Sequence, residues 1–90
     1  MNVVKFGETY NIKEEKETYV ISGDLIKTVQ GNVIINVATR TKEEEHIADL
    51  TGDYRVEGSE VMFTFKSPIE RYDEQFEIID DVISAVKSIL

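Results

Sequence analysis

The stretch Ser67–Leu90, SPIERYDEQFEIIDDVISAVKSIL, decides the fold, because its apolar residues recur at intervals of three and four. That spacing places them along one face of an α-helix. Ser67 followed three residues later by Glu70 matches a capping box, and Pro68 falls at the first helical position, where a missing N–H costs nothing. We therefore predict one continuous amphipathic helix over residues 68–90.

The apolar stripe of this helix is expected to pack against the rest of the domain. Its central members are Ile69, Tyr72, Phe76, Ile79, Ile83, Val86 and Leu90. Three further residues, Ile78, Val82 and Ile89, widen it to roughly 160° at about 100° per residue. We expect Phe76 to be a core residue. If the chain is a homo-oligomer subunit, the three border residues could remain exposed for contact with another subunit.

Short β-forming runs precede the helix. In Asp53–Lys66, apolar residues alternate with polar ones on both sides of Gly58-Ser59, which predicts a hairpin whose Phe63 and Phe65 point into the core. The run Val33–Ala38 is apolar on both faces apart from Asn36, which predicts a central strand covered on two sides. Each of the five glycines precedes Glu, Asp, Asn or Ser, so all five are expected in turns.

Together these patterns predict an α+β fold in a single domain of residues 1–90. Residues 1–66 form an antiparallel meander of six to seven short strands, and residues 68–90 form the C-terminal helix that closes it. An open twisted sheet and a PH-like partial barrel fit this layout equally well.

Composition narrows the classes of partner. The 90-residue chain carries 18 acidic and 10 basic residues, a net charge of −8, so direct binding to nucleic acid or to an anionic membrane is disfavoured. A protein partner, basic in character, is expected instead. The sequence contains no cysteine, begins without the apolar segment of a secretory signal, and has no run long enough to span a bilayer, which favours a cytoplasmic protein.

No residue set matches a catalytic, metal or cofactor signature, so we assign none and expect no enzyme activity. His46 is the single histidine, and strand spacing would point it away from Asp49. The acids Asp49, Asp53, Glu57 and Glu60 lack the ligand pattern of a calcium loop. The glycines form no phosphate-binding motif, and the serines form no nucleophile elbow.

One constellation remains as a candidate partner-binding site. Six carboxylates lie opposite the apolar stripe of the helix: Glu70, Asp73, Glu74, Glu77, Asp80 and Asp81. Residues three and four apart on a helix are about 5–6 Å apart, close to the spacing of phosphates along a nucleic-acid strand. We hypothesise a non-enzymatic protein-interaction module, in one version an inhibitor of phage or mobile-element type or a nucleic-acid mimic. The alternatives are a homo-oligomer subunit, a small-ligand-binding domain, or a helix face that only solvates the protein.

Overall fold

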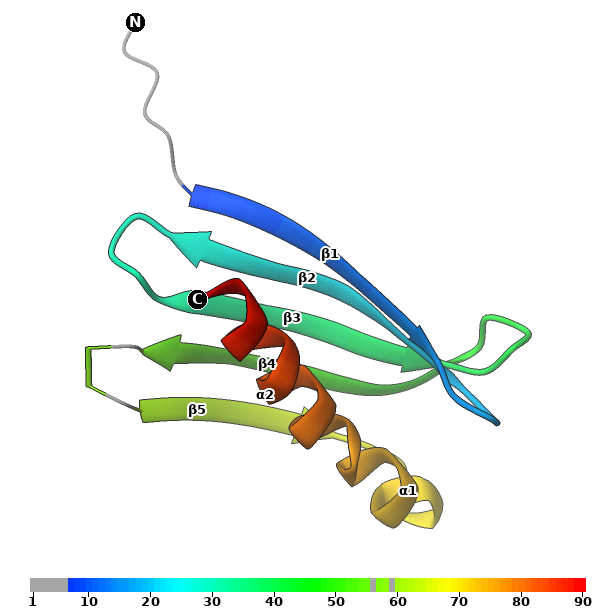
Figure 1. Cartoon of the computed structure of the whole chain (residues 1–90). Coiled ribbons are helices and arrows are strands. Elements are labelled where there is room, and N and C mark those ends of the chain that lie inside the picture. Colours follow the sequence, from blue (N-terminus) through cyan, green and yellow to red (C-terminus); the bar gives the residue numbers. More distant parts are fainter. Residues whose placement is uncertain (1–6, 56, 59) are drawn as a thin grey trace, which may run out of the picture.

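The computed structural model describes residues 7–55, 57–58 and 60–90, which form one sheet and one helical segment (Figure 1). The α+β class, with an antiparallel sheet and a C-terminal helix, is confirmed. Each strand pairs antiparallel with the next in chain order, so the sheet is an open meander with β1 and β5 at its edges. The strands are β1 (Gly7–Glu15), β2 (Val20–Thr28), β3 (Val33–Arg40), β4 (His46–Arg55) and β5 (Glu60–Lys66).

Within the described residues the sheet has five strands, fewer than the predicted six to seven, because two of the glycines expected in turns lie inside strands. Gly23 lies opposite Val37 in the middle of β2, and Gly52 lies opposite Phe63 in β4. A Cβ at Gly23 would lie 2.2 Å from the Asn36 carbonyl oxygen, so the close approach of the backbones requires glycine. Gly7 also lies in a strand, as the first residue of β1 opposite Thr28, so of the five glycines predicted in turns only Gly31 and Gly58 lie in the connections between strands.

The predicted hairpin of β4 and β5 is present. Its strands pair from Asp49 with Lys66 to Arg55 with Glu60. Within the predicted Gly58-Ser59 connection, Gly58 lies in a turn and residue 59 lies outside the described residues, as does residue 56.

The helical segment follows the predicted range but consists of three pieces: a 3-10 turn η1 (Ile69–Arg71), a short α1 (Tyr72–Phe76) and the longer α2 (Ile78–Ile89). The predicted capping box is wrong. Pro68 lies before the first turn rather than in it, and no side chain caps that turn. The Ser67 hydroxyl donates instead to the Pro68 carbonyl.

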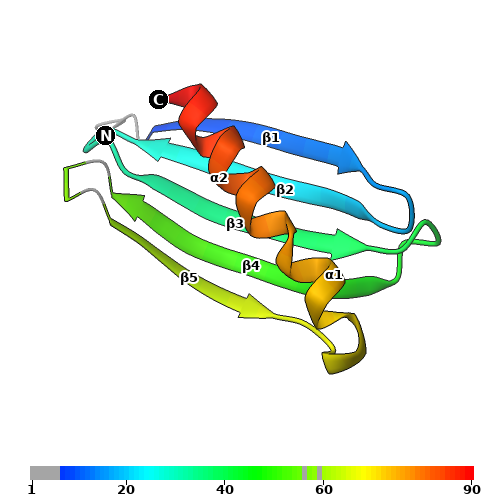
Figure 2. The same cartoon turned by 60° about the horizontal axis from the view of Figure 1, so that its bottom comes forward.

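The segment crosses one face of the sheet diagonally, from the end of β5 towards β1 and β2 (Figure 2). We call this the helix-covered face, and the other the open face. Alternate residues of β3 make the division clear, since Val33, Ile35 and Val37 are buried while Ile34 and Asn36 are exposed. β3 is central as predicted, but helix covers only one of its faces.

The buried face of the helix also differs from the predicted one. Ile78, Val82 and Val86 are almost completely buried, together with the polar Gln75. Tyr72 and Phe76, predicted to pack on the sheet, are 44% and 50% exposed. The supposed border residues Ile78 and Val82 are therefore core. The other buried apolar residues are Tyr19, Ile21, Leu25, Val33, Ile35, Val37, Ile47, Ala48 and Leu50.

Candidate functional site

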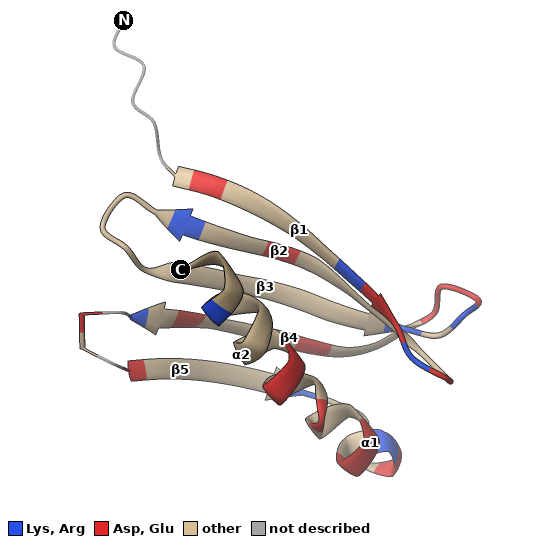
Figure 3. Ribbon diagram, in the orientation of Figure 1, with Lys and Arg blue, Asp and Glu red and all other residues tan. Residues whose placement is uncertain are grey.

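The six predicted carboxylates do not form one free surface. Glu70, Asp73, Glu77 and Asp80 are exposed, whereas Glu74 and Asp81 are half-buried. Figure 3 shows acidic positions on α1 and α2 and basic positions on the strands and loops beside them. The acids of the helix therefore fall into two groups, one exposed and one half-buried.

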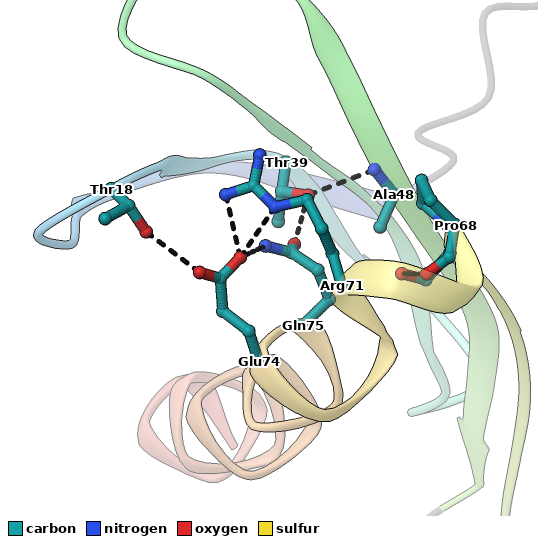
Figure 4. Close-up of polar contacts among 8 residues, drawn as sticks. Thr18, Thr39, Ala48, Pro68, Arg71, Glu74 and Gln75 are labelled. Atoms are coloured by element: carbon teal, nitrogen blue, oxygen red, sulfur yellow. Dashed lines mark hydrogen bonds and ion pairs between the residues drawn. The ribbon is translucent and has the colours of Figure 1, made fainter.

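Glu74 belongs to the second group (Figure 4). Its carboxylate accepts hydrogen bonds from the Thr18 hydroxyl at 3.0 Å, from the Arg71 guanidinium at 2.9 Å and from the Gln75 amide at 2.8 Å. Burial acts to raise the pKa of Glu74, but the hydrogen bonds from Gln75, Arg71 and Thr18 outweigh it and hold that pKa below its usual value of 4.5. Glu74 thus ties the start of the helix to the hairpin between β1 and β2.

Asp81 acts on the same hairpin about two turns further along the helix. Its carboxylate lies 2.9 Å from the ammonium of Lys16, and this hydrogen-bonded contact raises the pKa of Lys16. Both groups are partly exposed, so the ion pair contributes little stability by itself. Two of the six acids predicted to bind a partner are therefore bonded within the chain.

The depressed pKa of Glu74 predicts a pH dependence. The ionised form is favoured by folding, so its stabilising contribution is complete above the unfolded pKa and is lost as pH falls through the folded pKa. We expect Glu74→Gln to have a lower free energy of unfolding than wild type at pH 7. The difference in unfolding free energy between the two proteins should become smaller as pH falls below 4.5. Urea melts from pH 7 to pH 3 measure this.

Glu77→Gln is the matched control for that experiment, because it removes the same charge from the exposed side of the helix. Two outcomes would show that the Glu74 hydrogen bonds do not depend on its charge. In the first, the difference in unfolding free energy between wild type and Glu74→Gln stays constant across the pH range. In the second, it equals the difference between wild type and Glu77→Gln.

The end of β5 and the start of the helical segment carry an exposed aromatic patch whose residues the sequence pattern predicts to be core. Phe65 of β5 meets Tyr72 edge-on at 5.4 Å between ring centroids and Phe76 at 6.0 Å, while Tyr72 and Phe76 stack at 5.7 Å. Ile69, 86% exposed, precedes them on the first turn. We define the aromatic patch as Phe65, Ile69, Tyr72 and Phe76. Apolar side chains this exposed and this close together are typical of contact surfaces.

The exposed acids lie beside this patch. At about 100° per residue, Asp73 and Asp80 follow directly after Phe76 around the helix, and Glu77 comes next. Glu74 and Asp81 lie further round, on the side that faces β1, as their contacts with Thr18 and Lys16 require. The patch therefore has an acidic border on its outer side.

His46 and Asp49 are closer than predicted. The register between β3 and β4 shifts at Thr39/Arg40, where Arg40 pairs with His46 and Ile47 is left as the extra residue. This bulge brings the His46 Nε2 to 2.9 Å from the Asp49 carboxylate, with both side chains about half exposed. The prediction that they point to opposite sides was wrong, because strand alternation does not hold through a bulge.

An open groove of about 370 Å³ lies between β1, β2 and α2. Its apolar lining comes from Ile12, Ile21, Val82 and Ala85, and Lys13, Glu14 and Asp81 line its polar side. Among the described residues, no three histidines or acids gather where they could hold a metal ion. None of the described helices has the length and apolar character needed to cross a membrane.

Comparison with known proteins identifies no family for this chain. The chain matches no protein-family model, no curated protein and no solved structure.

Proposed function

We propose that this protein is a non-enzymatic protein-binding module whose contact surface is the aromatic patch with its acidic border. The observation that supports this most directly is the exposure of stacked Tyr72 and Phe76, at 44% and 50%. Aromatic side chains contribute disproportionately to binding when a partner removes them from water. Covering the sheet does not require exposed aromatic side chains on the outer side of the helix.

The border suggests the chemistry of the partner. Asp73, Glu77 and Asp80 carry negative charge next to the patch, and the whole chain carries −8. The complementary surface has an apolar centre and lysine or arginine at its rim, which increases the rate of encounter. A nucleic-acid mimic needs a longer row of free carboxylates. Because Glu74 and Asp81 are bonded within the chain, an aromatic contact with an acidic rim is the better-supported version. The cysteine-free composition favours a cytoplasmic partner.

The test compares three variants in affinity capture from a cell lysate, followed by titration of the recovered partner. The double variant Tyr72→Ser/Phe76→Ser should lose the partner, with affinity reduced about 30-fold or more, as for interface hot spots. The triple variant Asp73→Asn/Glu77→Gln/Asp80→Asn should slow association and flatten its salt dependence. The control Val29→Ser/Ile34→Ser removes exposed apolar side chains far from the patch, from the β2–β3 turn and the open face.

The expected outcome is a protein captured by wild type and by the control but not by the double variant. A partner that binds the double variant as tightly as wild type would contradict the proposal and place the contact elsewhere.

A further inference from the structure

The outer edge of β5 is the unpaired part of the sheet closest to the aromatic patch. β5 pairs with β4 and with no other strand of the described chain. Figures 1 and 2 show its outer edge free along the strand, with the turn into η1 lying past its end. Its sequence, EVMFTFK, contains no proline, and its pairing with β4 contains no bulge. An edge of this kind presents unpaired N–H and C=O groups that can accept another strand.

The residues of β5 are also complementary to themselves. In an antiparallel pair of two β5 strands centred on Phe63, Glu60 lies opposite Lys66 of the second copy, and Lys66 lies opposite Glu60. Opposite charges at directly facing positions stabilise a strand pair. Phe63 lies opposite its own copy, and Val61 lies opposite Phe65. This centre also gives the greatest overlap, because Phe63 is the middle residue of the strand.

This register also places apolar residues opposite apolar residues on one face of the sheet and charged residues opposite charged residues on the other. Val61, Phe63 and Phe65 lie on the helix-covered face, as shown by their pairing with Tyr54, Gly52 and Leu50. Glu60 and Lys66 lie on the open face, where their charges remain in water. Val61 is 39% exposed and Phe63 and Phe65 are only partly buried, so the second copy would cover apolar surface that the single chain leaves uncovered.

We propose that a second copy of this chain pairs with β5 in this register, forming a two-fold symmetric dimer with one continuous sheet of ten strands. The symmetry axis is perpendicular to the sheet, because the two strands are antiparallel and keep their faces. Both helices then lie on the same side of the sheet. The dimer does not require the partner proposed above. The two surfaces share Phe65, which lies opposite Val61 of the second copy, whereas Ile69, Tyr72 and Phe76 belong to the helical segment and lie outside the strand pair.

The opposite edge of the sheet behaves differently. If two β1 strands paired over their full length, Glu8 would lie opposite Glu14 of the second copy, on the same face. Facing like charges destabilise a strand pair. β1 therefore carries a charge pattern that opposes self-pairing, whereas β5 carries one that favours it, and this contrast selects the edge.

The test is a charge swap measured by sedimentation equilibrium. Wild type should show the mass of two chains, decreasing to one on dilution. Glu60→Lys and Lys66→Glu each place like charges at both facing positions, so each should weaken the dimer about ten-fold or more. The double variant Glu60→Lys/Lys66→Glu restores opposite charges and should recover wild-type affinity. Mixing the two single variants should also give a dimer, because each supplies the charge that the other needs.

Two controls test which edge of the sheet pairs and in which register. Glu14→Lys on β1 should leave the dissociation constant unchanged. Since the chain has no cysteine, Phe63→Cys introduces a unique thiol, which should cross-link to its own copy on mild oxidation, whereas Thr9→Cys on β1 should not. Wild type with the mass of one chain at every concentration would overturn the proposal. A dimer insensitive to the single charge changes, or one that the double variant fails to restore, would also overturn it.

Discussion

Ile78→Ala is expected to lower the free energy of unfolding by about 2–5 kcal/mol, the usual cost of emptying a fully buried aliphatic site. Ile78 is completely buried and belongs to the single core cluster between α2 and the sheet. For a domain of this size that loss is a large part of the total stability. Urea denaturation followed by far-ultraviolet circular dichroism measures it, and the m-value shows whether the unfolded state has changed.

Phe76→Ala is the informative comparison, because it removes a larger side chain from the same helix. Phe76 is half exposed and packs against Phe65 and Tyr72, so we expect its loss to cost about 1–3 kcal/mol, at about 0.5–1.5 kcal/mol for each of the two aromatic pairs. A loss from Phe76→Ala that equals or exceeds the loss from Ile78→Ala would mean that the patch is core and not a surface for a partner.

The sequence predicted the range of the helical segment correctly and the direction of its buried face incorrectly, and Gln75 explains the second result. The buried line of the helix runs through Gln75, Ile78, Val82 and Val86. A polar residue in that line makes it look like the boundary of the apolar stripe, so the pattern centres instead on Tyr72 and Phe76, about 80° away at 100° per residue. A stripe as wide as 160° was itself a signal that part of it would remain outside the contact with the sheet.

The candidate site was predicted in part for a similar reason. The acids Glu70, Asp73, Glu77 and Asp80 are exposed as expected, because helical periodicity is local. The roles of Glu74 and Asp81 depend on Thr18 and Lys16, more than 50 residues away in sequence, and no local pattern contains that information. The His46–Asp49 contact depends on a bulge that the sequence does not mark.

Thr39→Val is expected to lower the free energy of unfolding by about 2–6 kcal/mol, although valine has nearly the same shape and volume as threonine. The Thr39 hydroxyl donates to the Gln75 side-chain oxygen at 2.5 Å and accepts the Ala48 N–H at 3.1 Å (Figure 4). All three residues are completely buried. Valine would leave a buried donor and a buried acceptor without these partners, at about 1–3 kcal/mol for each group.

Three further variants separate this polar cluster from simple packing. Thr39→Ser keeps the hydroxyl and loses one methyl group, so it should cost only about 1 kcal/mol. Thr18→Val removes an exposed hydroxyl that also bonds to the helix, and it should cost less than Thr39→Val because water replaces the lost partner. In Thr39→Val/Gln75→Leu both partners become apolar, so the loss should be smaller than the sum of the single losses. Additive losses, or a Thr39→Ser protein as unstable as Thr39→Val, would show that the hydroxyl does not connect the helix to the strand bulge.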